Sequence, residues 1–567
     1  MTPHTFRAAA VQTLARLGDV QHNLEIVTGY VREAALQGAH LVVFPECMNS
    51  GYLFDSAAHA RELAEPLDGP YVRGLAGLCR EHGLFLASGM TEWDPRRQRI
   101  FNSGVLLDRT GDVILHYHKQ FLATHDQNWF AFGANGCPVV ETELGRLGLM
   151  ICFDGRIPEI ARCLALQGAE VILDMANFFA MDQAEMFVPA RAYENGVWIV
   201  AATKAGTERS IYYPGGSMIV DPAGRVRARQ PYDTHGLIVQ DVTPAEARRK
   251  RVYSGNDRLA DRRADAYQVL GQPYDSTPVA LAGSTPVAPR EAVAKAAAVQ
   301  MHVARGTALD DVVAMADHAA KLGVQILVFP EYAASARWAP DAAEARALAA
   351  RSKEVLEQIA AVCLRYRCYG VFSHVEEAEG RLFPTAFLLG PLGELLGRYR
   401  KVHLTAEEKA WAEPGNAFPV FQTDRGRIGI MLGYDGMFPE AARCLAVEGA
   451  DVIAWPASLR EAFEREWLAV PRAADNRCYV VLSNRLDSPY PGGSLVIPPA
   501  GFPLWDLNQI APPSRAMGAV MPAFLDLATS RQKQMIPKVD MFANRLTHTY
   551  GPLVARQAPA RPPGSAT

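Results

Sequence analysis

The sequence predicts a layered α/β fold that occurs twice along one chain. Short apolar runs alternate with helical patterns, and segments of the first half recur in the second at an offset of about 280 residues. The stretch between the halves is rich in Pro, Gly, Ser and Thr, as linkers are. Alternating strands and helices, together with hairpin-like strand pairs, indicate layered α/β architecture, and so long a period indicates a duplicated domain.

The elements of the first copy follow from local patterns. A helix is predicted over residues 23–37, because Gly38 suits its C-terminal end. A second helix is predicted between Pro158 and Gly168, which are typical of a helix start and a helix end. The predicted strands lie at residues 6–11, 41–44, 84–88, 103–107, 113–117, 147–151, 171–174, 198–202 and 217–220.

The repeats define the domain organisation. Leu41-Val-Val-Phe-Pro-Glu46 recurs as Ile326-Leu-Val-Phe-Pro-Glu331, and Gly145-Arg-Leu-Gly-Leu-Met-Ile151 recurs as Gly426-Arg-Ile-Gly-Ile-Met-Leu432. We therefore expect four parts in chain order. These are a catalytic domain at 1–275, a linker at 276–290, a second domain at 291–555 and a disordered tail at 556–567.

Composition narrows the class of protein. The 567 residues carry a net charge of -4, with 49% hydrophobic and 21% charged residues, which indicates a globular protein without a basic face for nucleic acid or anionic membrane. No apolar run approaches the roughly 18 residues of a membrane span, and the N-terminus lacks the order of a signal peptide, so a cytoplasmic protein is expected. The nine cysteines contain no Cys-x-x-Cys pair, which argues against disulfides and a zinc site.

Three polar residues of the first copy directly follow apolar strands: Glu46, Lys119 and Cys152. Taken singly, Glu46 is typical of a solvated carboxylate, Lys119 of a surface cation and Cys152 of a core thiol. Together they indicate catalysis at one sheet edge. Cys152 is the candidate nucleophile, Glu46 the general base, and Lys119 the cation for an oxyanion. The backbone N–H of Phe153 is expected to assist Lys119.

These residues resemble the nitrilase superfamily of carbon–nitrogen hydrolases. The resemblance rests on Phe44-Pro-Glu46, Lys119-Gln-Phe-Leu122, Ile151-Cys-Phe-Asp-Gly-Arg-Ile-Pro-Glu159 and Gly215-Gly-Ser217, and it covers essentially the whole of each copy. It implies a four-layer αββα sandwich, duplicated in tandem, and a Glu–Lys–Cys triad. It also implies a thioester acyl-enzyme and no metal or organic cofactor.

The sequence departs from that pattern at two places. Asp126 stands seven residues after Lys119, where family members usually carry a glutamate, and its shorter side chain is expected to reach less far into the site. In the second copy Gly433 stands where Cys152 stands in the first. Glycine has no nucleophile, so the second copy is predicted to be a pseudo-enzyme. Its degenerate site consists of Glu331, Lys401, Glu408 and Gly433.

The predicted function is hydrolysis of a non-peptide carbon–nitrogen bond in an amide or carbamoyl compound, with release of ammonia or an amine. Nitrile hydrolysis, acyl transfer to an amine and a non-catalytic ligand-binding scaffold stay open as alternatives. The expected partner is a small amide-type molecule. Superfamily members commonly pair as dimers, so the second copy is expected to be the permanent intramolecular partner of the first; a further homo-oligomer is left open. Ligand binding at Glu331, Lys401 and Glu408 is the rival role for this copy.

Overall fold

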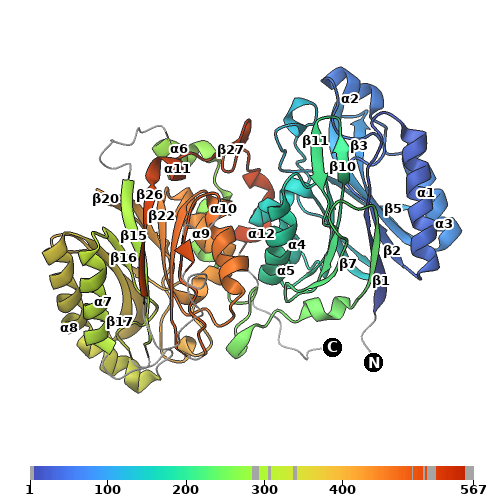
Figure 1. Cartoon of the computed structure of the whole chain (residues 1–567). Helices are drawn as coiled ribbons and strands as arrows, with labels where there is room; N and C mark the ends of the chain where they lie inside the picture. Colours follow the sequence, from blue (N-terminus) through green and yellow to red (C-terminus); the bar gives the residue numbers. More distant parts are fainter. Residues whose placement is uncertain are drawn as a thin grey trace. The chain divides into compact units, whose positions relative to one another are not determined.

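The computed structural model describes residues 5–283, 293–303, 308–335, 341–487, 489–501, 505–506 and 519–555. The chain forms two compact units (Figure 1). The first consists of Met1–Arg251 with Gln534–Thr549, and the second of Val252–Lys533 with Tyr550–Thr567. Part of the expected linker, residues 284–290, and the expected tail at 556–567 lie outside the described residues. The described part of the linker includes a short helix, α6 (Pro278–Gly283).

Two six-stranded sheets form the centre of the first unit. One has the order β14-β1-β2-β3-β4-β5 and the other the order β13-β12-β9-β8-β7-β6, with the hairpin β10-β11 beside them. The bounds of these strands are β1 (Phe6–Gln12), β2 (Leu41–Val43), β3 (Phe85–Asp94), β4 (Arg99–Leu107), β5 (Val113–His118), β6 (Val139–Thr142), β7 (Gly145–Ile151), β8 (Val171–Ala176), β9 (Trp198–Thr203), β10 (Ala205–Glu208), β11 (Ile211–Pro214), β12 (Met218–Val220), β13 (Val226–Arg229) and β14 (Gly236–Val242).

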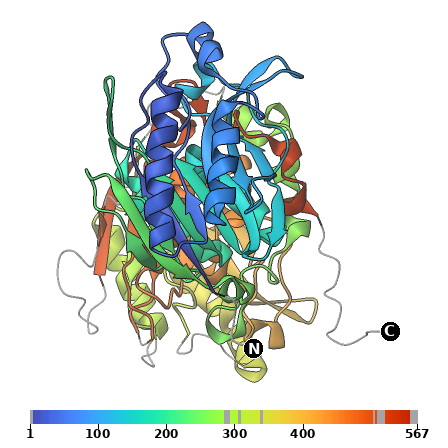
Figure 2. The same ribbon diagram turned by 90° about the vertical axis from the view of Figure 1, so that its right-hand side faces the viewer.

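Helices cover both outer faces of this pair of sheets. Helices α1 and α3 lie side by side over the first sheet (Figure 2), and α4 and α5 cover the second (Figure 1). Side chains such as Val27 and Val31 of α1 and Leu75 of α3 pack into the core of the first sheet, and each contributes about 1.5–3 kcal/mol. The expected αββα sandwich is thus confirmed. The helices are α1 (Val20–Leu36), α2 (Ala57–Leu63), α3 (Pro70–His82), α4 (Pro158–Leu166) and α5 (Val188–Asn195).

The second unit repeats this architecture. Its sheets have the orders β19-β18-β17-β16-β15-β26 and β20-β21-β22-β23-β24-β25. Helices α7 and α8 cover the first of them, and α9 and α10 cover the second (Figure 1). The bounds are β15 (Val293–Gln300), α7 (Ala308–Lys321), β16 (Ile326–Val328), α8 (Ala342–Tyr366), β17 (Tyr369–Ala378), β18 (Arg381–Leu389), β19 (Leu395–Arg400), β20 (Val420–Thr423), β21 (Gly426–Ile430), α9 (Pro439–Val447), β22 (Val452–Ala457), α10 (Val470–Asn476), β23 (Tyr479–Asn484), β24 (Leu495–Ile497), β25 (Trp505–Asp506) and β26 (Ala519–Asp526).

The two copies exchange their C-terminal segments. The segment after Arg251, which ends the first copy, packs within the second unit, and Gln534–Thr549, near the end of the second copy, packs within the first. Each exchanged segment is held by a buried ion pair at the start of a helix. Arg545 Nε lies 3.0 Å from Glu159 Oε1 of α4, and Arg262 Nε lies 2.7 Å from Glu440 Oε1 of α9. Completion of each unit therefore needs residues from the other copy.

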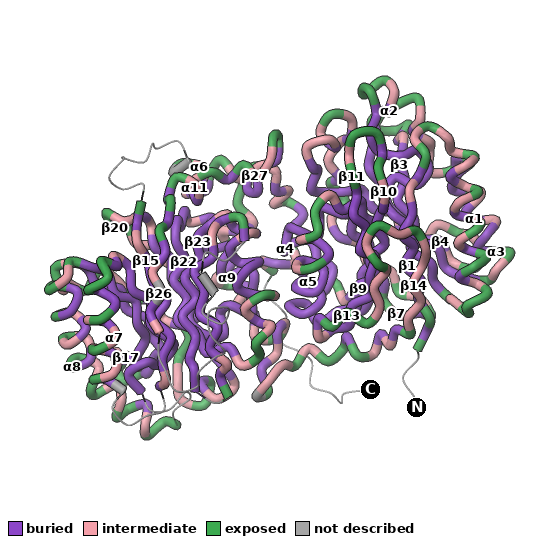
Figure 3. Tube along the Cα trace, in the orientation of Figure 1, coloured by how far each residue is buried: buried purple, intermediate pink, exposed green. Residues whose placement is uncertain are grey.

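Burial follows the layers of each unit. The strands are buried along most of their length, whereas the outer faces of α1 and α8 are exposed (Figure 3). No helix among the described residues is both long and apolar enough to cross a bilayer.

Candidate active site

The three candidate catalytic residues of the first unit lie just beyond the C-terminal ends of β2, β5 and β7. Glu46, Lys119 and Cys152 are each about 1% exposed. Lys119 Nζ donates a hydrogen bond to Glu46 Oε1 at 2.7 Å. The charges of both residues act on the thiol, since burial and Glu46 raise the pKa of Cys152 while Lys119 lowers it. The structure thus brings the predicted trio together.

Lys119 lies between two carboxylates. Its Nζ is 2.7 Å from Glu46 Oε1 and 2.8 Å from Asp126 Oδ2. Burial opposes its charge, but Asp126 and Glu46 hold the pKa of Lys119 well above its usual value. A lysine that keeps its proton cannot act as a general base, but it can stabilise a developing negative charge.

Asp126 makes the contacts that a longer glutamate makes in the second unit. It accepts a hydrogen bond from Tyr52 at 2.9 Å in addition to its ion pair with Lys119. In the second unit Glu408 accepts hydrogen bonds from Lys401 at 2.8 Å and from Tyr332 at 2.8 Å. The one-methylene difference is therefore accommodated, and Asp126 still reaches its lysine.

Asn102 on β4 is a site residue that the sequence patterns did not identify. Its Nδ2 donates to Glu46 Oε1 at 2.5 Å and to Asp126 Oδ1 at 3.3 Å. Its carbonyl oxygen also accepts the backbone N–H of Lys119 at 2.9 Å. Asn102 thereby fixes both carboxylates that flank Lys119. In the second unit Pro384 holds the same place, since its carbonyl accepts the N–H of Lys401.

The candidate nucleophile sits in a strained turn. Cys152 begins the 3₁₀ turn Cys152–Arg156 between β7 and α4, and its φ is +51°. A non-glycine residue in this left-handed region costs roughly 1–2 kcal/mol, so the surroundings must hold it. The Cys152 N–H donates to Asp174 Oδ1 at 3.0 Å, and its carbonyl accepts from Gln183 Nε2 at 3.0 Å. These contacts confirm the sharp turn that the sequence predicts before Pro158.

Asp154 ties this turn to the loop that carries Lys119. It accepts hydrogen bonds from the N–H of Ile151 at 3.2 Å, from the N–H of Phe121 at 2.8 Å and from the hydroxyl of Tyr117 at 2.7 Å. Burial raises the pKa of Asp154 to about 7. The relative position of Cys152 and Lys119 thus depends on one buried carboxyl group.

Phe153 and Arg156, which follow Cys152 in the same turn, both make defined contacts. Phe153 is buried, and its ring stacks on Phe121 at 5.6 Å between centroids. Arg156 donates to both oxygens of Asp182, at 2.6 and 2.7 Å. Arg156 thus pairs with a neighbouring acid of the same unit. The oxyanion role of the Phe153 N–H stays a prediction.

Three residues near the thiol have buried polar atoms that lack a hydrogen-bond partner among the described residues: Glu46 Oε2, Asn177 Nδ2 and Oδ1, and the Tyr213 hydroxyl. The thiol of Cys152 donates to the backbone carbonyl of Asn177 at 3.6 Å. Burial raises the pKa of Tyr213, and the charges of Glu208, Glu46 and Cys152 raise it further. An unpaired buried polar group costs about 1–3 kcal/mol, so such groups usually bind water or a ligand.

Aromatic side chains surround these polar atoms. Phe179 packs against Tyr213 at 5.2 Å and against Tyr52 at 6.0 Å between ring centroids. Lys204 Nζ lies 4.7 Å from the centre of the Tyr213 ring, and its charge is paired with Glu208 at 2.5 Å. Phe179 and Tyr213 thus give the surroundings of the thiol an aromatic component.

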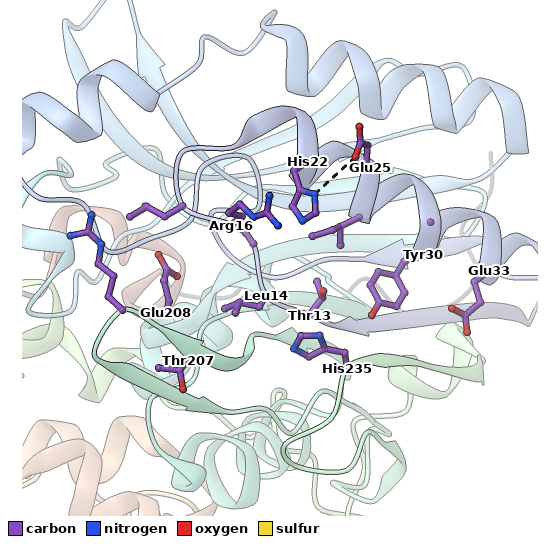
Figure 4. Close-up of a pocket in the computed structure, with 15 residues that line it drawn as sticks. Thr13, Leu14, Arg16, His22, Glu25, Tyr30, Glu33, Thr207, Glu208 and His235 are labelled. Carbon is purple, nitrogen blue, oxygen red and sulfur yellow. Dashed lines mark ion pairs between the residues drawn. The ribbon is translucent and has the colours of Figure 1, made fainter.

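A cleft of about 910 Å³ lies between α1 and the β10-β11 hairpin (Figure 4). Glu46, Lys119 and Cys152 are not among its lining residues. Glu208 at its edge accepts the backbone N–H of Tyr52 at 2.7 Å and of Leu53 at 2.9 Å. Glu208 thus helps to hold the segment that carries Tyr52. The candidate catalytic residues lie outside the cleft.

In the second unit the space of the missing side chain is filled. Lys401 Nζ pairs with Glu331 at 2.8 Å and with Glu408 at 2.8 Å, as in the first unit. Gly433 begins the equivalent 3₁₀ turn with a φ of +49°. A Cβ atom added to Gly433 would lie only 2.2 Å from Glu331 Oε1 and 2.3 Å from Oε2. The Glu331 carboxylate thus occupies the place where a cysteine side chain would begin.

Two regions of the chain match one family of known proteins. The sequence profile of the carbon–nitrogen hydrolase family matches residues 7–252 and 295–510. A nitrilase of Pyrococcus abyssi is 32% identical over 46% of this chain and 98% of its own length. The human deaminated glutathione amidase is 32% identical over 47% of this chain and 84% of its own length. An amidase from Nesterenkonia sp. is a structural neighbour with 28% identity and a TM-score of 0.39, over 44% of this chain and 95% of its own.

Proposed function

Since this chain belongs to the carbon–nitrogen hydrolase family and is an amidase-like hydrolase, we propose that its first unit cleaves a small amide or carbamoyl compound through a thioester on Cys152. The observation that carries this proposal is that the two carboxylate oxygens of Glu46 have different surroundings. Glu46 Oε1 is held by Lys119 and Asn102, whereas Oε2 is buried without a partner among the described residues. An oriented carboxylate with one free oxygen suits a general base.

In the proposed reaction Glu46 accepts and returns each proton. Glu46 takes the thiol proton of Cys152, and the sulfur attacks the substrate carbonyl carbon. The oxyanion is stabilised by the Lys119 ammonium group, with the Phe153 N–H as the second donor. Glu46 then gives its proton to the departing nitrogen, and the amine or ammonia leaves the thioester. Glu46 next removes a proton from water, and the oxygen attacks the thioester carbon. The carbon–sulfur bond breaks, the acid is released, and Glu46 returns its proton to the sulfur of Cys152.

Asn177 supports an amide or carbamoyl substrate over a nitrile. Its backbone carbonyl lies 3.6 Å from the thiol, and its buried side chain, which has no partner among the described residues, offers both donor and acceptor atoms. A carboxamide or carbamoyl group presents both a donor and an acceptor, whereas a nitrile nitrogen only accepts. The neighbouring rings of Phe179 and Tyr213 suit a partly apolar remainder of the substrate.

We propose that the second unit is not catalytic and serves as the permanent partner of the first. The reciprocal ion pairs Arg545–Glu159 and Arg262–Glu440 support this role, because each unit is completed by a segment of the other copy. The position of Glu331 against Gly433 also speaks against covalent catalysis there.

The test is intact mass spectrometry with parallel measurement of ammonia release. Full-length wild type and the variants Cys152→Ala and Glu46→Gln are incubated with a panel of primary amides, carbamoyl compounds and nitriles. We expect release by wild type only, and an acyl adduct that Cys152→Ala lacks. Turnover that survives Cys152→Ala would overturn the proposal, and turnover of nitriles alone would overturn the choice of substrate class.

A further inference from the structure

A second cluster of chemically active side chains lies on the first sheet of the first unit, outside the candidate active site. Glu92 is on β3, and His116 and His118 are on β5, with β4 between the two strands. Glu92 Oε2 accepts hydrogen bonds from His116 Nε2 at 2.6 Å, from His118 Nε2 at 3.0 Å and from Ser103 Oγ at 2.5 Å. Two imidazole nitrogens thus converge on one carboxylate oxygen.

The second unit carries the same glutamate with different partners. Glu376 on β17 accepts hydrogen bonds from Arg398 Nη1 at 2.5 Å, Arg400 Nε at 2.9 Å and Thr385 Oγ1 at 3.0 Å. These residues occupy the strand positions that His116, His118 and Ser103 occupy in the first unit. Two permanently charged guanidinium groups in one copy are therefore replaced by two imidazoles in the other.

This replacement places metal-ligating side chains around a buried carboxylate. Glu92 is only 4% exposed. In the second unit two arginines supply the positive charge that a buried carboxylate needs. In the first unit two imidazoles stand in their place, and imidazole nitrogens bind divalent cations, which guanidinium groups do not.

We propose that Glu92, His116 and His118 form a binding site for a divalent transition metal ion of the zinc class. The three ligand atoms lie within 4.8 Å of one another. Zinc binds such atoms at about 2.0–2.2 Å, which places ligand atoms roughly 3.4 Å apart. The imidazole nitrogens lie 2.6 and 3.0 Å from Glu92 Oε2, so binding an ion requires each to move away from the carboxylate by less than about 1 Å.

The surroundings suit three protein ligands and one open position. The His118 ring is 2% exposed and stacks on Phe101 at 3.9 Å between centroids, which fixes its plane. The His116 side chain is 26% exposed and leaves a path for an ion and a water molecule. Each imidazole would bind through the Nε2 lone pair and carry its proton on Nδ1.

The site adjoins residues of the candidate active site along the chain. His118 precedes Lys119, and Ser103 follows Asn102. An ion held here would tie β3 to the end of β5 and so restrain the strand that leads into Lys119. Binding itself does not depend on the chemistry proposed for Cys152.

The test is metal binding by the full-length protein after removal of metals with a chelator. Zinc is titrated against a chromophoric competitor, and cobalt is added separately to record the visible absorption of tetrahedral coordination. We expect one ion per chain. The double variant His116→Arg/His118→Arg rebuilds the arrangement of the second unit, so it should fold and should bind zinc roughly tenfold or more weakly.

Two further variants keep the result interpretable. Glu92→Gln preserves the size of the side chain and is also expected to weaken binding roughly tenfold or more. His59→Arg is the matched control, because His59 has a similar exposed fraction of 27% and pairs with a single carboxylate, Asp55, at 3.0 Å. It should leave zinc binding unchanged. No binding by wild type, or binding that survives in both the double variant and Glu92→Gln, would overturn the proposal.

Discussion

Glu331 in the second unit occupies the space into which Gly433 would have to project a side chain, because a Cβ atom on Gly433 would lie 2.2 Å from Glu331 Oε1. In the first unit the equivalent glutamate, Glu46, lies next to a cysteine and leaves that space open. The position of the Glu331 carboxylate is thus compatible with glycine at position 433 but not with a cysteine side chain. Restoring the cysteine alone would not restore the site.

The variant Gly433→Cys, made in a Cys152→Ala background, is therefore expected to give no acyl adduct and no ammonia release. The added side chain also overpacks a closed site, so the free energy of unfolding should fall by about 1–3 kcal/mol. Intact mass spectrometry and chemical unfolding measure the two effects. An adduct on the introduced thiol would show that Glu331 can withdraw from it.

Lys119 and Lys401 offer a matched pair of substitutions, since each lies between two buried carboxylates. Replacing either lysine with methionine leaves buried charge uncompensated and should cost about 3–5 kcal/mol of stability. Only Lys119→Met should also lower kcat, by roughly 100-fold or more, because only this lysine is proposed to face an oxyanion. Steady-state kinetics below the unfolding transition separate the two effects. Equal kcat values in the two variants would remove Lys119 from the mechanism.

The pH dependence of thiol alkylation tests the coupling between Cys152 and Glu46. Burial and the charge of Glu46 raise the pKa of Cys152, so alkylation by iodoacetamide should stay slow at neutral pH and accelerate only above the usual thiol range. Glu46→Gln removes a negative charge that disfavours the thiolate, and the midpoint should move to lower pH. Glu331→Gln in the second unit is the control and should leave the midpoint unchanged. An unshifted midpoint in Glu46→Gln would contradict the proposed contact.

The exchanged segments predict different outcomes for two equivalent arginines. Arg545→Met leaves Glu159 buried without this cation and should destabilise the first unit by about 3–5 kcal/mol. Arg262→Met should destabilise the second unit to a similar extent through Glu440. Hydrogen exchange of α4 and α9, read by mass spectrometry, assigns the loss to one unit or the other. Uniform protection in both variants would contradict the exchange.

A fragment that ends at residue 275 lacks Gln534–Thr549, which packs within the first unit. We expect it to be insoluble or to self-associate. Size-exclusion chromatography with light scattering measures its state, and the full chain is the control. A soluble, fully active monomer would refute the view that the second copy completes the first.

Local patterns predicted most of the strands and the first helix, because burial and periodicity are local properties. The observed α1 and the strands β1, β5 and β7 lie within a few residues of the predicted ranges. Glu46, Lys119 and Cys152 were found because polar residues that follow apolar strands meet at one sheet edge. Helix α3 was not predicted, although Pro70 at its start and Gly83 at its end are ordinary helix signals.

The missed site residues depend on contacts between distant segments. Asn102 lies inside an otherwise apolar strand and becomes significant only when β4 lies between β3 and β5. Asp174 similarly acts on Cys152 through a hydrogen bond across two strands. His116 and His118 are two residues apart on one strand and so share a face, but Glu92 comes from a different strand. The pairing of Arg262 with the second copy has no local signal at all.

The exchange of segments also sets when the first unit can finish folding. Its last piece, Gln534–Thr549, is synthesised about 280 residues after Arg251, which takes roughly 15–60 seconds at ordinary rates of translation. During that interval Arg545, which forms a buried ion pair with Glu159 of α4 in the complete protein, has not yet been synthesised. A ribosome that stops early therefore releases a first copy that carries every candidate catalytic side chain but lacks part of its own fold. We therefore expect activity from the completed chain alone.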